Sequence, residues 1–325
     1  MRNWNEIIGH DRIKEYLRDA VKKNKPGHAY IFNGGAGIGK RTMADIFVKS
    51  LMCTGEGEKP CGQCRSCKQV DSGNSPDLFR VTHEKQAISV EDVRSQIVSP
   101  MGIKPYESEY KIFIVDEAEK MNSAAQNALL KTFEEPPEYG IIILLTENAD
   151  AFLETIRSRA ITLNFGEVQQ KDVIDFLVRE KKVPDYLAAS VAACAGGCPG
   201  KAYRWIDDDD FQKKLEDGLR ILRKLERLDT ATVIDTAKSW GKNKDEVDFF
   251  LNLFEIWIRD VLLIKSTGRT GRCLLRNETD YEKGQAERKE YRELARMLDL
   301  KEDFKARIKA NVNLESAAED FLLSL

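Results

Sequence analysis

The stretch "HAYIFNGGAGIGKRT", residues His28–Thr42, joins a short apolar run to a glycine-rich loop. The apolar run is too short for a buried helix and predicts a buried strand. The loop follows the pattern G-x-x-x-x-G-K from Gly34 to Lys40, in which backbone N–H groups surround phosphate oxygens at a helix N-terminus. The stretch therefore predicts the strand–loop–helix unit of an α/β nucleotide-binding core.

The loop departs from this pattern at its last position, where Arg41 stands in place of Ser or Thr. The usual hydroxyl ligates Mg²⁺, and a guanidinium, which only donates hydrogen bonds, cannot. Thr42 would point about 100° further round a helix, so it is no simple substitute. The sequence leaves open whether the loop still binds ATP or ADP with Mg²⁺. The residues predicted to line such a site are Gly34, Gly37, Gly39, Lys40, Arg41 and Thr42.

An acidic pair supplies the second half of a nucleotide site. The apolar run Lys111–Val115 ends in Asp116 and Glu117. An acid at the end of a strand can hold Mg²⁺ through water, and a second can orient the attacking water. Asn148 follows another apolar run and is expected to face the γ-phosphate. The alternative for the acidic pair is a solvated turn.

Further short runs rich in Ile, Val, Leu or Phe alternate with helical patterns up to about residue 165. This alternation predicts a parallel sheet covered by helices on both faces, and the remainder of the chain looks all-helical. We expect an α/β domain over 1–166, a small helical domain over 167–207 and an all-helical domain over 208–325. Within the last, apolar residues at helical spacing around Trp257 predict bundle core, and Lys265–Asp280 predicts a loop.

Four of the seven cysteines cluster within fifteen residues, at spacing C-x7-C-x2-C-x2-C. Four close thiols suit a closed tetrahedral Zn²⁺ site with no open position for a substrate, so we predict a structural zinc. The main alternative is an iron–sulfur centre, but the sequence lacks the Cys-Pro that would complete a ferredoxin-type run. The predicted ligands are Cys53, Cys61, Cys64 and Cys67.

Composition limits the classes of function. The net charge of −3 over 325 residues argues against a generally basic nucleic-acid-binding protein, so DNA contact would need a local patch or a partner. The sequence carries no apolar run of the roughly 18 residues that a membrane span needs, and its N-terminus lacks an apolar signal core. We expect an intracellular, cytoplasmic protein.

Taken together, these motifs resemble the AAA+ subunits of bacterial DNA polymerase III clamp loaders. The resemblance covers nearly the whole chain. It runs through "WNEIIGHDRIKEYL", "HAYIFNGGAGIGK", the four-cysteine insert, "KIFIVDEAEKMNSAAQNALLKTFEEPP", "LLTENADAFLETIRSRA" and "NVNLESAAEDFLLSL". It implies that the three domains are a RecA-like core, a helical lid and a helical collar that holds the ring together. It also implies that Ile8 lies near the adenine pocket.

The resemblance also indicates which function the departures from the family pattern affect. Arg159 matches the arginine of a Ser-Arg-Cys motif, here Ser158-Arg159-Ala160, which acts in trans on the ATP of a neighbouring motor subunit. Arg41 and Gly200 both replace residues that active motors use for hydrolysis in cis. The chain therefore resembles the stationary subunit, with weak or absent hydrolysis of its own and Asp116 and Glu117 as remnants.

The partners implied by the resemblance are the gamma/tau motor subunits, the delta subunit, the sliding clamp and, through the assembled complex, primer-template DNA. The chain would belong to a nucleotidyltransferase assembly without carrying a polymerase site. Two alternatives remain from sequence: an ATP-hydrolysing motor subunit of the gamma/tau type, and a zinc-stabilised nucleic-acid-binding module. ATP hydrolysis by the isolated chain would favour the first, and salt-dependent DNA binding would favour the second.

Overall fold

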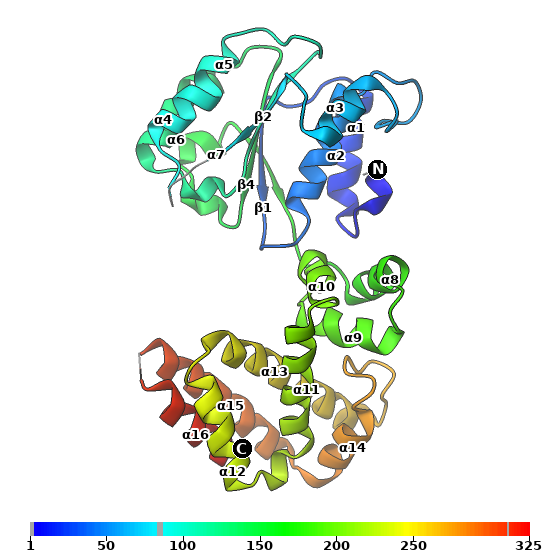
Figure 1. Cartoon of the computed structure of the whole chain (residues 1–325), viewed down its shortest axis with the longest axis vertical. Coiled ribbons are helices and arrows are strands. Elements are labelled where there is room, and N and C mark those ends of the chain that lie inside the picture. The colour runs from blue at the N-terminus through cyan, green and yellow to red at the C-terminus, as the bar shows by residue number, and fades with distance from the viewer. Residues whose placement is uncertain (1–2, 83–86, 311) are drawn as a thin grey trace. The chain divides into compact units, whose positions relative to one another are not determined.

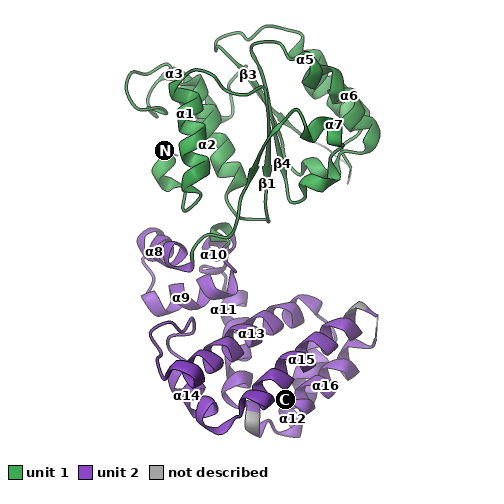
Figure 2. Cartoon of the chain, turned by 180° about the vertical axis from the view of Figure 1, so that it is seen from behind, with its two compact units in different colours: residues 1–169, 198–200 green, residues 170–197, 201–325 purple. Residues whose placement is uncertain are grey.

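The computed structural model describes residues 3–82, 87–310 and 312–325. The chain divides into two compact units, shown in different colours in Figure 2. Unit 1 comprises Met1–Gln169 with Cys198–Gly200, and unit 2 comprises Gln170–Gly197 with Lys201–Leu325. The predicted lid and collar both fall almost entirely within unit 2, and their separation into two domains stays a prediction.

A five-stranded parallel sheet forms the centre of unit 1, which confirms the predicted α/β core. The strand order is β2-β3-β4-β1-β5. Each of the predicted apolar runs forms one strand, within one or two residues of the expected ends. The strands are β1 (Ala29–Asn33), β2 (Leu78–Val81), β3 (Lys111–Val115), β4 (Gly140–Thr146) and β5 (Ile161–Asn164).

The three central strands are buried on both faces, which explains their continuous apolar sequence. Ile143 of β4 pairs with Ile114 of β3 on one side and with Tyr30 of β1 on the other. Because the strands are parallel, the loops that follow β1, β3 and β4 lie at the same edge of the sheet. This arrangement brings the glycine loop and the acidic pair together.

Helices cover both faces of the sheet (Figure 1). On one side lie α1 (Asp11–Lys22), α2 (Lys40–Met52) and α3 (Arg65–Ser72). On the other side lie α4 (Val90–Val93), α5 (Ser99–Met101), α6 (Ser123–Glu134) and α7 (Glu154–Arg157). In the core on this second side, Phe113 and Leu144 of the sheet pack with Leu129 and Ile156 of the helices.

Unit 2 is helical in its described residues, as expected. Its helices are α8 (Gln170–Lys181), α9 (Asp185–Cys194), α10 (Pro199–Trp205, which begins in unit 1), α11 (Asp209–Arg223), α12 (Thr230–Trp240), α13 (Lys244–Thr267), α14 (Thr279–Arg288), α15 (Tyr291–Lys309) and α16 (Leu314–Ser324). Trp257 is fully buried on α13, and its Nε1 donates to Gln285 Oε1 at 2.9 Å, which confirms its role in the core.

The predicted loop Lys265–Asp280 is too long at both ends. Helix α13 continues to Thr267 and ends at Gly268, which adopts a left-handed conformation with φ 65°. Helix α14 begins at Thr279, so the connection spans residues 268–278. The glycine that ends α13 is visible in the sequence, and its C-cap signal marks the end better than composition does.

None of the helices in the described part of the chain is long and apolar enough to cross a membrane.

Candidate functional site

The glycine loop lies between β1 and α2, as its sequence predicts. Gly37 and Gly39 adopt left-handed conformations, with φ 76° and 107°, which residues with a Cβ rarely adopt. A Cβ added to Gly34 would lie 2.5 Å from the backbone oxygen of Phe165. Glycine is thus required at these three positions by the shape of the loop itself.

Lys40 folds back over the loop that precedes it. Its Nζ donates to the backbone oxygens of Gly34 and Gly35, the latter at 3.0 Å. Desolvation lowers the pKa of Lys40, against the attraction of Glu147, Glu119 and Asp116. The ammonium therefore lies where it can meet an anion bound in the loop, and it is surrounded by carboxylates.

Arg41, the residue that breaks the motif, forms an ion pair with Asp116. Its Nη1 lies 2.9 Å from Asp116 Oδ2, and both side chains are partly exposed to solvent. Asp116 follows β3 directly, so the carboxylate that would hold Mg²⁺ faces a guanidinium instead. The glycine loop keeps groups suited to phosphate, but this charge pair does not fit a Mg²⁺ site of the usual P-loop type.

Gly200 contacts the glycine loop within unit 1. Its backbone N–H donates to the Gly37 oxygen at 2.9 Å, and an added Cβ would lie 2.8 Å from that oxygen. By the family resemblance, Gly200 stands where active motor subunits carry an arginine. The structure adds that a larger residue at this position could not keep this close backbone approach.

Other acidic residues lie close to the loop. Glu117 pairs with Lys120, whose Nζ lies 2.6 Å from its Oε2. Glu119 and Glu147 are not among the residues predicted for the site, yet both attract the Lys40 ammonium. Glu119 Oε2 is buried and has no hydrogen-bond partner among the described residues. Its position as the third acid of "DEAE" is the signal that could have identified it.

The side chain of Asn148 acts as a helix cap in this structure. Its side-chain oxygen accepts the backbone N–H of Asp150 at 3.0 Å and caps a short 3₁₀ helix, Ala149–Ala151. Thr146 is buried at the end of β4, and its hydroxyl bonds to the backbone of Asn148. Thr42, also predicted for the site, is half-buried in the first turn of α2.

The segment around Ile8 reaches the glycine loop through its neighbour His10. A ring nitrogen of His10 lies 3.1 Å from the Ile38 backbone oxygen, and the ring packs edge-on against Phe165. Desolvation lowers the pKa of His10. Ile8 itself is half-buried.

Arg159 lies in the turn between α7 and β5. Its guanidinium lies 3.3 Å from Glu134 Oε1 and donates to the Thr155 backbone oxygen at 3.1 Å. The side chain keeps 38% of its surface exposed. Arg157, two residues earlier, pairs instead with Asp150 at 2.7 Å.

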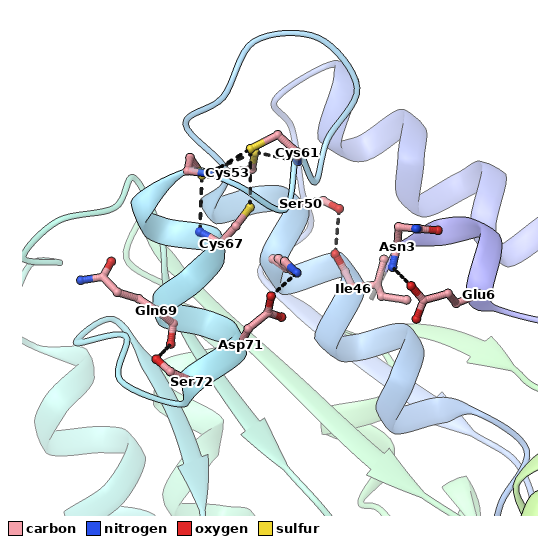
Figure 3. Close-up of polar contacts among 12 residues, drawn as sticks. Asn3, Glu6, Ile46, Ser50, Cys53, Cys61, Cys67, Gln69, Asp71 and Ser72 are labelled. Carbon is pink, nitrogen blue, oxygen red and sulfur yellow. Dashed lines mark hydrogen bonds and ion pairs between the residues drawn. The ribbon is translucent and has the colours of Figure 1, made fainter. Parts of the chain in front are cut away.

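The four predicted cysteine ligands converge into one cluster. Their sulfur atoms all lie within 4.8 Å of one another, and all seven cysteines of the chain are free thiols. Figure 3 shows Cys53, Cys61 and Cys67 pointing toward one another where α2 ends and α3 begins. The cluster thus ties the insert to the helix that follows the glycine loop.

Backbone groups support negative charge on these sulfurs. The N–H of Cys61 points to Cys53 Sγ at 3.3 Å, and the N–H of Cys64 points to Cys61 Sγ at 3.4 Å. Burial opposes ionisation of Cys64, but hydrogen bonds from Cys67 and Thr54 bring its pKa down to about 5. A Cβ at Gly55 would lie 2.6 Å from Cys61 Sγ, so the insert folds closely around the cluster. The four cysteines can hold a four-coordinate metal ion.

Comparison with known proteins gives one consistent result. The sequence profile of the family described as "DNA polymerase III, delta subunit" matches residues 9–169. The chain is 28% identical to DNA polymerase III subunit delta' of Bacillus subtilis over 99% of this chain and 98% of that protein.

Gamma and tau sequences of DNA polymerase III match a smaller share of the chain. DNA polymerase III subunit gamma/tau of Mycobacterium tuberculosis is 36% identical over 62% of this chain and 36% of that protein. DNA polymerase III subunit tau/gamma of Haemophilus influenzae is 32% identical over 54% of this chain and 25% of that protein. The chain therefore spans about a quarter to a third of these longer relatives, whereas it matches delta' from end to end.

With its parallel α/β core, its modified glycine loop and this full-length likeness, the chain belongs to the delta' family of DNA polymerase III clamp-loader subunits.

Proposed function

We propose that the chain serves as the delta' subunit of a DNA polymerase III clamp loader and helps to load the sliding clamp onto primed DNA. The observation that carries this proposal is the likeness to delta' over 99% of the chain. The partners are the gamma/tau motor subunits and the delta subunit, and DNA is reached through the assembled complex in the cytoplasm.

Clamp loading in a reconstituted system tests this function. Gamma/tau, delta, the sliding clamp and primed DNA from the same source are mixed with and without the purified chain. We expect clamps to accumulate on DNA only when the chain is present. Equal loading without the chain would contradict the proposal.

We further propose that the chain hydrolyses little or no ATP itself. The Arg41–Asp116 ion pair supports this proposal. In it, the Arg41 guanidinium pairs with the carboxylate that an active P-loop site uses to bind Mg²⁺. The alternative, a motor subunit, predicts steady-state hydrolysis by the isolated chain. Turnover by the chain alone at the rate of a gamma/tau subunit would decide for the motor.

The arginine supplied in trans is the proposed catalytic contribution of this chain. Arg159 lies partly exposed in a turn, where its guanidinium contacts Glu134, the Thr155 backbone oxygen and the Ser158 hydroxyl. These surface contacts are weak enough to be exchanged for a neighbouring subunit's nucleotide. A trans arginine of this kind accelerates phosphoryl transfer by roughly 10³–10⁵-fold.

Arg159→Ala and Arg157→Ala form a matched pair for this contribution. We expect Arg159→Ala to lower turnover at the adjacent motor site by roughly 10³-fold or more, whereas Arg157→Ala should leave it unchanged. The measurement is single-turnover ATP hydrolysis by the assembled complex. Undiminished turnover with Arg159→Ala would refute the role.

The proposed metal at the four-cysteine cluster is one structural Zn²⁺. The support is the set of four sulfurs within 4.8 Å of one another and the backbone N–H groups aimed at them. Bound there, Zn²⁺ would crosslink the end of α2 to the start of α3. Iron at this cluster, measured by elemental analysis, would contradict the assignment.

A further inference from the structure

A second cluster of metal-binding residue types lies buried in unit 2, far along the sequence from the four cysteines. Asp260 is on α13, Cys273 is in the connection 268–278, and Glu282 is on α14. One ligand atom from each lies within 4.8 Å of the other two. The exposed fractions of the three residues are 0%, 3% and 0%.

Glu282 has no partner for its carboxyl group. Both of its oxygens are buried and lack a hydrogen bond among the described residues. The buried polar residues one turn away on either side are well paired. Glu278, which directly precedes α14, accepts two bonds of 2.7 Å from Arg223, and Gln285 of α14 bonds to Trp257 and to the Leu222 backbone oxygen. A buried carboxyl group without a hydrogen-bond partner is unfavourable whether or not it is protonated. A ligand bound beside Glu282 would remove this cost.

The other two groups define which ligand fits. Asp260 Oδ2 accepts the backbone N–H groups of Leu274 and Leu275, at 2.6 and 2.9 Å, and thereby holds the connection beside the cluster. Asp260 Oδ1 pairs with Arg259 at 2.6 Å. With all three groups ionised, two carboxylates and a thiolate would carry three negative charges and Arg259 would offset one, which leaves the charge that one divalent cation would balance.

We propose that Asp260, Cys273 and Glu282 form a second metal site that binds one Zn²⁺. A thiolate together with carboxylates suits Zn²⁺, whereas Mg²⁺ and Ca²⁺ prefer oxygen ligands alone. The ion would tie the connection 268–278 to both α13 and α14. This site is independent of the nucleotide loop and of the four-cysteine cluster, so the proposal does not depend on the clamp-loading function.

Zinc content of the full-length chain tests the site. The chain is produced in zinc-supplemented medium, dialysed to remove weakly held metal and analysed for Zn²⁺ per chain. We expect two Zn²⁺ in the wild type and one in Glu282→Gln. Glu287→Gln, an exposed change on the same helix, should retain two and serves as the matched control.

A bound proton on Glu282 is the competing explanation, and glutamine imitates a protonated glutamate closely. If Glu282→Gln holds as many Zn²⁺ as the wild type, the metal proposal is overturned. Cys273→Ser provides a second variant, and we expect it to hold one Zn²⁺ as well. Helical content by circular dichroism is measured for each variant, so that loss of metal is separated from loss of fold.

Discussion

Arg41 is the residue on which the interpretation of the nucleotide site depends. In the sequence, Arg41 shows only that the usual hydroxyl is missing. In the structure, its Nη1 lies 2.9 Å from Oδ2 of Asp116, the acid that follows β3. An exposed ion pair of this kind contributes at most about 1 kcal/mol to stability. The pair therefore matters for the charge it places in the site more than for holding the fold together.

Arg41→Thr would restore the full loop pattern and release Asp116. We expect the isolated variant to gain Mg²⁺-dependent binding of ATP, because the new hydroxyl and the freed carboxylate can both contribute to holding the ion. The measurement is calorimetric titration with ATP in Mg²⁺ and in EDTA. Arg94→Thr, an exposed change on another element, is the control. Equal binding by Arg41→Thr and the wild type in Mg²⁺ would contradict the account.

Asp77 illustrates a residue whose charge stabilises the fold. Fully buried before β2, it accepts the backbone N–H groups of Tyr106, Glu107 and Ser108 at 2.7–2.9 Å. Burial favours the neutral acid, but these bonds outweigh it and lower the pKa of Asp77. The charged form thus fixes the loop that leads into β3.

Asp77→Asn should destabilise the chain by about 1–3 kcal/mol at pH 7, since the amide can replace only part of these bonds. Because the folded pKa lies below the unfolded one, the stabilisation is present above pH ~4 and is lost as pH falls through the folded pKa. The difference in urea midpoint between the wild type and Asp77→Asn should therefore shrink below pH ~4. A constant difference down to pH 2 would contradict a charge-based role.

At the scale of elements, the four-cysteine insert links two helices on one face of the sheet. Lys49 of α2 is buried and pairs with Asp71 of α3 at 2.5 Å, so a polar contact reinforces the link made by the cysteines (Figure 3). The sheet core on the opposite face has its own contacts between strands and helices α4, α6 and α7. The insert can therefore loosen without loss of the sheet.

Cys64→Ser should release the metal of this cluster and raise amide exchange in residues 53–72, because metal binding by thiolates is coupled to local folding. Amides of β1, β3 and β4 should stay protected. Hydrogen exchange by mass spectrometry measures both. Cys194→Ser, the same change outside the cluster, is the control. Faster exchange throughout the sheet would show that the insert supports the whole of unit 1.

The elements of the fold were largely predictable, for a physical reason. Strands buried on both faces need uninterrupted apolar runs, and such runs as Lys111–Val115 stand out in the sequence. At the start of α4, Ser89 and Asp92 form a capping box, a local feature with a recognisable spacing. The connection predicted after α13 is longer than the observed one, because polar composition does not mark where a helix ends.

The candidate site was predictable in its residue types but not in its contacts. Spacing identified the glycine loop and the cysteine cluster, since both are local in sequence. The Arg41–Asp116 pair and the approach of Gly200 to Gly37 join residues more than seventy positions apart, and no local pattern predicts them. The contact that Asn148 makes as the cap of Ala149–Ala151 is likewise not visible in the sequence, and its predicted place at a γ-phosphate stays a prediction.

In the whole molecule, we propose that one chain has two different relations to ATP. The modified loop predicts weak or absent hydrolysis in cis, whereas the exposed Arg159 is proposed to act on a neighbour. Unit 2, which holds the proposed second metal site, would make the assembly possible by joining the ring. The two relations can be separated, because Lys40 and Arg159 lie on different elements of unit 1.

ATP turnover by the reconstituted clamp loader, carrying either Lys40→Ala or Arg159→Ala in this chain, separates the two proposed relations to ATP. We expect Lys40→Ala to leave turnover and clamp loading at the wild-type level, because we propose that this chain's own site does not hydrolyse ATP. We expect Arg159→Ala to lower both. Loss of turnover with Lys40→Ala and full turnover with Arg159→Ala would contradict the account.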